Sequence, residues 1–325
     1  MDEEPMPALV SPRQTRQKTR LAAAVAFVSP HSESNSQPMP AASASNTKAF
    51  MSETKIHSLP ETLGASLKLK HLTRKNLQLL LKKRRLLQEN QLEAPQDMQV
   101  KGLAQSLMAT LLFAQEEAGT AVCISRDGIL LTCSHCVAET ADEFDKSKSH
   151  WLLFASGQVV EAKTLVWDSR RDLALLKVIA AQEPPSSTTS DPSRAAVGFP
   201  FITPATSPPP LKSRLVCVGH PGSNDLEAAE TGIQTGYDML HLSTGTFRGC
   251  VEGQDVQDNS DIGALMHTCW TYWGHSGAPL IERRTGRLVG LHSSWDDKTG
   301  MRRGIALEAI QGFLRENERH LVENL

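Results

Sequence analysis

The sequence predicts an all-β body made of two packed sheets or barrels. From Gly119 onward, short apolar runs alternate with turn residues; Thr120–Ser125 and Ile129–Thr132, for example, flank Arg126-Asp127-Gly128. Two strands joined by a tight turn have this pattern. About twelve such runs occur, in two groups separated by residues 183–210, which contain eight prolines. Strands cannot hold so many residues without a backbone donor, so this stretch is predicted to be a long loop or linker between two β units.

The composition excludes several classes of protein. The 325 residues include 34 Lys and Arg and 36 Asp and Glu, a net charge of -2, which excludes a uniformly basic nucleic-acid binder. The longest apolar run, Leu21–Val28, has eight residues, whereas a bilayer-spanning helix needs about 20. We therefore expect no transmembrane segment. Six cysteines in a chain of this length are too few for a disulfide scaffold.

The N-terminal tail, residues 1–63, is expected to be disordered. Its first 49 residues are rich in Ser, Ala, Pro and Gln and have few large apolar side chains, so folding could not offset the loss of chain entropy. Basic residues just before Leu21–Val28 leave a transit peptide open, although the acidic start Asp2-Glu3-Glu4 argues against one. Without a clear secretory signal we expect an intracellular protein, of cytoplasm or nucleus.

Residues 64–98 are predicted to hold a basic amphipathic helix, because leucines recur at spacings of three, four and seven among lysines and arginines. The block Lys82–Arg85 is consistent with a nuclear localisation signal, a phosphate-contacting patch or a membrane-surface helix. A weak anionic partner for residues 64–92 is one hypothesis. The other is a helix that packs on the β body and leaves its charges in solvent.

The expected elements of the body follow in chain order. Val100–Gln115 has helical spacing, and strands are predicted in two groups. The first group continues with Trp151–Phe154, Val159–Val166 and Leu173–Ile179. The second comprises Leu215–Val218, Ile233–Gly236, Met239–Thr246, Ala264–Thr268, Ala278–Ile281, Leu288–Ser293 and Arg303–Leu307, followed by a helix over Glu308–Val322.

Three local motifs supply residues for nucleophilic catalysis. His135 follows the strand that ends near Thr132, and Asp172 opens the apolar run Leu173–Ile179. Ser276 lies between two glycines in Gly274-His275-Ser276-Gly277. A serine hydroxyl is a poor nucleophile unless an imidazole accepts its proton and later returns it to the leaving group. A carboxylate holds the imidazole in the right tautomer, and glycines let backbone N–H groups turn toward the oxyanion. Each motif alone is weak, and the three together are specific.

These motifs resemble those of the chymotrypsin-fold, or trypsin-like, serine proteases, and most of all their HtrA/Deg branch. Thr132–Val137 resembles the family's T-x-x-H-x-V strand end, Asp172–Lys177 matches its D-L-A-L-L-K strand, and Gly274–Leu280 is similar to its G-N-S-G-G-P-L loop. Val218–Gly222 resembles its G-N-P-x-G turn. The resemblance covers about residues 105–315, which leaves no room for a PDZ domain behind it.

The resemblance implies two six-stranded antiparallel β-barrels with a C-terminal helix. The domains expected from it are a protease domain at 99–325 with a first barrel at 105–182, the Pro-rich linker at 183–210, a second barrel at 211–307 and a helix at 308–322. It implies polypeptide substrates. Trimers are common in the HtrA branch, so a homo-oligomer is open.

The resemblance also implies the role of each site residue. His135 would be general base and acid, Asp172 the orienting carboxylate and Ser276 the nucleophile, with the N–H groups of Gly274 and Ser276 as the oxyanion hole. Peptide bonds would be hydrolysed through an acyl-enzyme. Ser293 lies on the strand that would pair with substrate. Trp270, six residues before the nucleophile, would narrow the specificity pocket and favour small apolar side chains, or else belong to the core.

Two departures from the family pattern are consistent with a second hypothesis. His275 replaces the usual Asn or Asp before the nucleophile, and Ala278 replaces a glycine. The alternative is therefore a catalytically impaired domain that binds polypeptide or acts as a scaffold.

No cofactor or metal is expected. Cys133 and Cys136 enclose His135 in a C-x-x-C spacing, which leaves a redox or zinc role open, although packing around the histidine is the simpler interpretation. A bridge between Cys123 and Cys136, as in secreted trypsins, is not expected in a reducing compartment.

Overall fold

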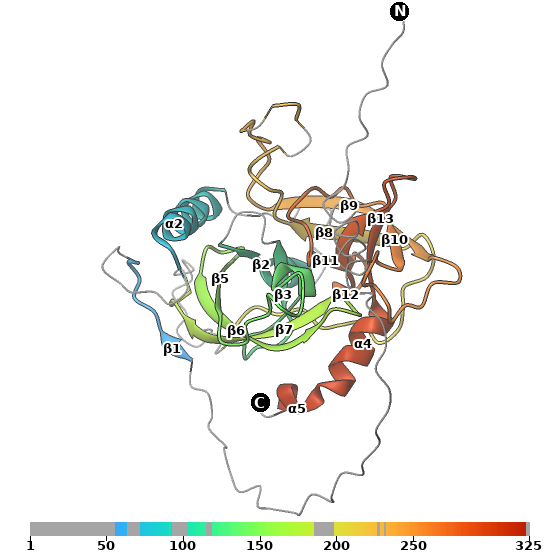
Figure 1. Ribbon diagram of the computed structural model, residues 1–325, viewed down its shortest axis with the longest axis horizontal. Helices are drawn as coiled ribbons and strands as arrows, with labels where there is room; N and C mark the ends of the chain where they lie inside the picture. Colours follow the sequence, from blue (N-terminus) through green and yellow to red (C-terminus); the bar gives the residue numbers. More distant parts are fainter. Residues whose placement is uncertain are drawn as a thin grey trace, which may run out of the picture. The chain divides into compact units, whose positions relative to one another are not determined.

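Two closed six-stranded antiparallel barrels make up most of the described chain (Figure 1). The computed structural model describes residues 56–63, 72–90, 92, 103–114, 119–184, 198–225, 228–230 and 232–322. The first barrel contains β2 (Thr110–Phe113), β3 (Thr120–Cys123), β4 (Ile129–Thr132), β5 (Ser149–Phe154), β6 (Val159–Asp168) and β7 (Leu173–Ala181). The second contains β8 (Arg214–Gly219), β9 (His241–Cys250), β10 (Leu265–His267), β11 (Pro279–Glu282), β12 (Arg287–Trp295) and β13 (Arg302–Ala306).

The first barrel closes through β7, which pairs with both β4 and β6. Its strands follow the order β7-β4-β3-β2-β5-β6. The short strand β1 (His57–Ser58) adds a parallel pair at the far end of β7. Most side chains of β2, β3, β4 and β5 are buried on both faces, as the unbroken apolar runs in the sequence require.

The second barrel has the order β10-β13-β12-β11-β8-β9, with β9 returning to β10. Helix α4 (Leu307–Glu316) begins directly after β13 and packs on β12 and β13, and α5 (Glu318–Val322) follows it. The predicted architecture, two six-stranded barrels with a C-terminal helix, is confirmed.

Three predicted elements differ in the structure. The helix expected over Val100–Gln115 is only α3 (Leu103–Met108) in the described part, and Thr110–Phe113 forms β2 because all four of its side chains are buried between β3 and β5. No strand covers Ile233–Gly236; Gln234 makes only an isolated bridge to Asn224, and Ile233 is exposed. The helix expected over Glu308–Val322 is interrupted at Asn317.

Helix α2 (Arg74–Glu89) is anchored to the first barrel. Thr73 caps its first turn by accepting a hydrogen bond from the Asn76 N–H. Leu77, Leu80 and Leu87 are buried along one face, together with Lys83, whose ammonium donates to the Phe113 carbonyl of β2. A buried lysine is unavailable to an outside partner, so the basic block Lys82–Arg85 is not an uninterrupted basic surface.

Several sequence expectations lie outside the described residues. These are the tail up to residue 55, the segments 64–71 and 93–102, and residues 185–197 of the Pro-rich linker. Among the helices that are described, none combines the length and the apolar character needed to cross a bilayer. Homo-oligomerisation, an anionic partner for α2 and the compartment stay predictions.

The anchoring of α2 predicts an asymmetric response to truncation of neighbouring leucines. Leu80→Ala should lower the free energy of unfolding by about 2–5 kcal/mol, because Leu80 is fully buried and a cavity would remain. Leu81→Ala, on the exposed side of the same turn, should change it by less than about 0.5 kcal/mol. Urea unfolding of the full chain measures both. Equal effects would contradict the placement of α2.

Candidate active site

His135 lies in a single 3₁₀ turn, Ser134–Cys136, directly after β4. The Trp167 indole of β6 fixes this turn by donating to the Ser134 carbonyl at 3.0 Å and to the Ala138 carbonyl at 3.2 Å. The Ser134 N–H donates to the Asp172 carbonyl at 3.1 Å. The imidazole is therefore held on a rigid corner of the first barrel.

Asp172 directs its carboxylate at this turn from the start of β7. The His135 Nδ1 lies 2.8 Å from Oδ1 and 3.0 Å from Oδ2. Oδ1 also accepts from the Ser134 hydroxyl at 3.0 Å and from the His135 N–H at 3.3 Å. Asp172 is buried, and its φ of 56° is in the left-handed region, which Asp tolerates better than most residues. Such a backbone at a buried polar residue is typical of a functional site.

The segment that carries Ser276 is tied to the first barrel through Thr120 of β3. The Thr120 N–H donates to the Ser276 carbonyl at 2.7 Å, and its hydroxyl donates to the Gly274 carbonyl at 3.0 Å. Gly277, with φ of 84°, lies so close that a Cβ there would be 2.0 Å from the Thr120 carbonyl oxygen. The glycine after the serine is therefore required by this close approach.

The backbone around Ser276 presents two free N–H groups. The Trp273 carbonyl accepts from the Gly222 N–H at 2.6 Å. A trans peptide directs its carbonyl and its N–H to opposite sides, so the Gly274 N–H points away from Gly222. Within the described part of the chain, neither the Gly274 N–H nor the Ser276 N–H has a hydrogen-bond partner. Two such donors could stabilise an oxyanion.

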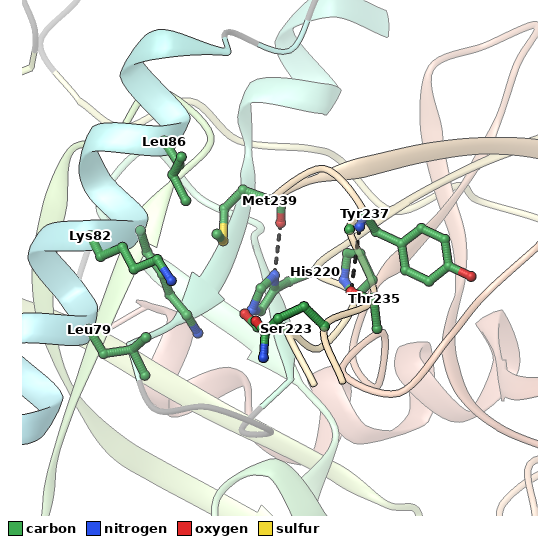
Figure 2. Close-up of a pocket in the computed structure, with 12 residues that line it drawn as sticks. Leu79, Lys82, Leu86, His220, Ser223, Thr235, Tyr237 and Met239 are labelled. Carbon is green, nitrogen blue, oxygen red and sulfur yellow. Dashed lines mark hydrogen bonds between the residues drawn. The ribbon is translucent and has the colours of Figure 1, made fainter. Parts of the chain in front are cut away.

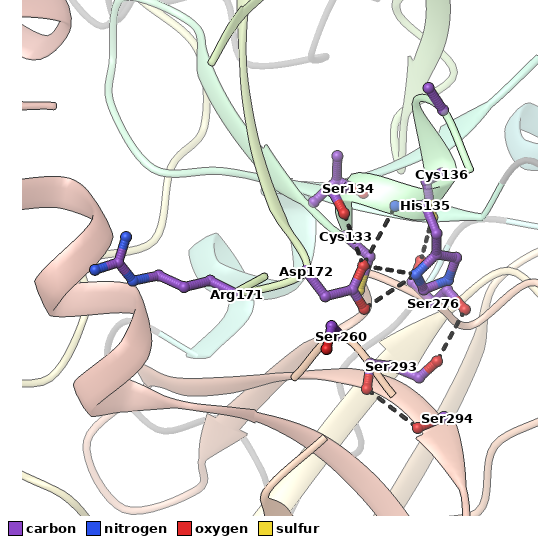
Figure 3. A network of polar contacts seen from close by, with 12 residues as sticks. Cys133, Ser134, His135, Cys136, Arg171, Asp172, Ser260, Ser276, Ser293 and Ser294 are labelled. Atoms are coloured by element: carbon purple, nitrogen blue, oxygen red, sulfur yellow. Dashed lines mark hydrogen bonds and ion pairs between the residues drawn. The ribbon is translucent and has the colours of Figure 1, made fainter. Parts of the chain in front are cut away.

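The Ser276 hydroxyl donates to the Ser293 carbonyl of β12 at 3.2 Å and makes no hydrogen bond to the His135 imidazole. Figure 3 shows the Ser276 side chain beside the His135 ring, with Asp172 on the other side of that ring. Catalytic hydrogen bonds are often long or poorly aligned before substrate binds.

His275 is buried and uncharged where the family pattern has Asn or Asp. Its Nδ1 lies 3.0 Å from the Tyr272 carbonyl and 3.1 Å from the Tyr272 nitrogen, so the ring braces its own loop. The ring packs on Gly219, where a Cβ would be 2.5 Å from its Cδ2. Burial lowers the pKa of His275 to about 3.

Two more histidines are buried behind the nucleophile loop. The His267 Nε2 lies 3.1 Å from the His292 Nδ1. Burial first, and then the charge of Arg302, lower the pKa of His267 to about 3. Burial, and then the neighbouring His267, also lower the pKa of His292 well below its ordinary value.

The aromatic residues near Ser276 fall into two groups. Trp270 packs on Tyr237 and His241, with ring centroids 4.9 and 4.6 Å apart. Trp273 and Trp295 instead meet edge to face at 4.6 Å, one just before Ser276 and one at the end of β12. The sequence motifs singled out Trp270 and missed the other two, because the pairing of Trp273 with Trp295 exists only after the barrel closes.

A cavity of about 150 Å³ lies under α2, away from His135, Asp172 and Ser276. Figure 2 shows Leu79, Lys82 and Leu86 of α2 facing His220 and Met239. The His220 Nδ1 lies 2.8 Å from the Met239 carbonyl. The lining includes Pro221, which precedes Gly222, the donor to the Trp273 carbonyl. The cavity therefore adjoins the segment that holds this carbonyl.

All six cysteines are free thiols. The Cys133 thiol lies 3.5 Å from the His292 carbonyl, and the Cys136 thiol lies 3.5 Å from the Ser276 carbonyl. Each thiol thus contacts a different backbone carbonyl of the second barrel. They do not form a paired C-x-x-C site.

The family model described as a trypsin-like peptidase domain matches residues 119–291, more than half of the chain. The chain belongs to the trypsin-like peptidase family. The match spans both barrels and includes the three motifs that hold His135, Asp172 and Ser276. The resemblance to trypsin-like proteases in the sequence is thus confirmed.

Solved structures of several peptidases are similar to this trypsin-like domain in fold. The Rv3671c protease from M. tuberculosis, active form, is 17% identical with a TM-score of 0.47, over 68% of this chain and 86% of that one. A serine endoprotease from Yersinia pestis is 16% identical with a TM-score of 0.45, over 70% and 67%. The HtrA-type protease AlgW with decapeptide is 17% identical with a TM-score of 0.42, over 62% and 52%. A comparison with curated proteins gave no match.

The buried histidines predict that this peptidase domain loses stability in acid. Their pKa values are below the ordinary value near 6.5, so the unfolded chain binds more protons once the pH falls below about 6.5. Between pH 6.5 and 3, His267 and His275 should each remove up to about 1.4 kcal/mol per pH unit, and His292 acts in the same direction. Urea unfolding at pH 7, 6 and 5 tests this. A flat profile between pH 7 and pH 5 would contradict the burial of these histidines.

Proposed function

We propose that this trypsin-like peptidase is a serine endopeptidase with the triad His135, Asp172 and Ser276. One observation carries the proposal: the buried Asp172 carboxylate lies 2.8 Å from the His135 Nδ1, and Figure 3 shows the imidazole between this carboxylate and Ser276. Since Nδ1 donates to the carboxylate, Nε2 has the free lone pair that a general base needs. The family membership supports hydrolysis of peptide bonds.

In the proposed mechanism the Ser276 Oγ attacks the substrate carbonyl while its proton moves to the His135 Nε2. The negative charge on the tetrahedral intermediate is stabilised by the N–H groups of Gly274 and Ser276. The imidazolium then gives its proton to the leaving amine, and the acyl-enzyme forms on Ser276. Water, activated by the same imidazole, releases the acid.

The open edge of β12 fits an extended peptide next to Ser276. Pairing of β12 with β11 ends at Leu291, whereas its pairing with β13 continues to Trp295. Residues 293–295 thus have one backbone edge without a strand partner, beside the nucleophile. A substrate strand could pair there, as in β-augmentation.

The triad proposal predicts separable effects of two substitutions. Ser276→Ala should abolish hydrolysis of an unfolded protein and labelling by a fluorophosphonate. Asp172→Asn should lower kcat about 10⁴-fold with the fold intact, since Asn tolerates the left-handed backbone but favours the wrong imidazole tautomer. Labelling kinetics and circular dichroism measure these effects. Unlabelled but folded wild-type protein would instead support the impaired, polypeptide-binding alternative, with Ser276 locked onto the Ser293 carbonyl.

The Trp273–Trp295 pair is proposed to limit the side chain that precedes the cleaved bond. The two indoles close the space between the loop before Ser276 and the end of β12. Arg302 lies 5.8 Å from the Trp295 ring and helps to hold it. Small residues such as Ala fit this arrangement best.

Enlarging this space should change specificity. We compare kcat/KM for substrates with Phe and with Ala at the residue before the cleaved bond. Trp295→Gly should raise the Phe-to-Ala ratio of kcat/KM by roughly 10- to 100-fold. Peptide anilide substrates measure the ratio. Trp270→Leu is the control, because that ring packs on Tyr237, His241 and His275 rather than on the Trp273–Trp295 pair. A larger shift from Trp270→Leu would favour the sequence-based assignment of Trp270.

A further inference from the structure

Three metal-binding side chains converge beside the proposed catalytic pair. The Cys133 Sγ, a ring nitrogen of His135 and a carboxylate oxygen of Asp172 all lie within 4.8 Å of one another. Among the described residues they form the only group of three His, Cys, Asp or Glu side chains gathered this closely. Figure 3 shows the Cys133 side chain against the Asp172 carboxylate.

The donor atoms suit zinc. Thiolate sulfur, imidazole nitrogen and carboxylate oxygen are its usual ligands, at about 2.0–2.3 Å. In a tetrahedron these bond lengths put neighbouring ligand atoms roughly 3.3–3.6 Å apart. Here the Nδ1–Oδ1 distance is 2.8 Å and the three ligand atoms lie within 4.8 Å of one another, so shifts of about 1 Å would place three of the four ligands of a tetrahedron.

The backbone makes this group rigid. Cys133 directly follows β4, His135 belongs to the 3₁₀ turn that Trp167 holds, and Asp172 directly precedes β7. β4 and β7 are paired neighbours, with Thr132 opposite Ala174. The three ligands therefore come from one corner of the first barrel and need no change in its sheet.

We propose that Cys133, His135 and Asp172 form a zinc site that reversibly inhibits the peptidase. The binding rests only on these three side chains, whereas the inhibition rests on the proposed triad. From the sequence, Cys133 and Cys136 are both candidate zinc ligands. In the structure only Cys133 lies beside the Asp172 carboxylate, whereas Cys136 faces Ser276, so Cys136 is not part of the proposed site.

The inhibition follows from the tautomer of His135. Zinc takes the Nδ1 lone pair, so the one proton of the neutral ring must reside on Nε2. The Cys133 thiol gives its proton to solvent as the thiolate–zinc bond forms, and nothing is oxidised or reduced. Nε2 then has no lone pair to accept the proton of Ser276. The zinc ion also replaces the Nδ1–H···carboxylate hydrogen bond that orients the base.

The test compares wild type with Cys133→Ser and Cys133→Ala, and uses Cys136→Ala as the matched control. After EDTA treatment, each full-length protein is titrated with ZnCl₂ while fluorophosphonate labelling is followed, with MgCl₂ as a second control. Wild type and Cys136→Ala should lose at least about 90% of the labelling rate and regain it with EDTA. Both Cys133 variants should need at least about 100-fold more zinc, since even the loss of an outer-shell partner weakens binding about 10- to 100-fold.

Cobalt absorbance measures metal binding by a readout that does not depend on activity. With CoCl₂, wild type and Cys136→Ala should develop a sulfur-to-cobalt charge-transfer band that both Cys133 variants lack. Labelling of the metal-free Cys133 variants shows that they are folded. Absence of the band in wild type, or its persistence in Cys133→Ala, would overturn the site. A Cys133-dependent band in a wild-type protein that never labels would support the site and refute the proposed triad.

Discussion

The contact between the two barrels at Thr120 is the constraint on which the candidate site depends. His135 and Asp172 belong to the first barrel and Ser276 to the second, so their chemistry requires the barrels to keep one relative position. Thr120 fixes it by donating its N–H to the Ser276 carbonyl and its hydroxyl to the Gly274 carbonyl. The same hydroxyl accepts from the His220 N–H at 3.0 Å. One residue of β3 thus joins the first barrel to the loop that carries Ser276 and to the segment that holds the Trp273 carbonyl.

The second barrel supports its nucleophile loop with neutral groups instead of an ion pair. His275 is buried, its ring fills the space that Gly219 leaves, and its Nδ1 contacts the Tyr272 backbone. Trypsin-like domains with an acid at this position pair it with a new N-terminus. His275 instead holds its loop through neutral contacts with Tyr272 and Gly219. The departure at position 275 is therefore compatible with an ordered site.

Much of the fold could be predicted from the sequence, and the residues of the candidate site could be named from it, because both depend on local patterns. Alternating apolar runs and turn residues located most strands, and the motifs around His135, Asp172 and Ser276 are short and contiguous. Contacts between distant segments could not be predicted. Nothing in the sequence around Thr120, Trp167 or Trp295 indicates which distant residues their side chains contact in the folded barrels. Likewise Thr110–Phe113 has helical spacing, and only its burial between two strands makes it β2.

The most direct measurement is a crystal structure of the protein after reaction with a peptidyl boronic acid, which forms a tetrahedral adduct with an activated serine. The account predicts a bond from boron to the Ser276 Oγ. One boronate oxygen should accept from the N–H groups of Gly274 and Ser276 at about 2.7–3.1 Å, and the His135 Nε2 should approach another. An adduct at a different residue, or no adduct with His135 and Ser276 placed as they are now, would contradict it.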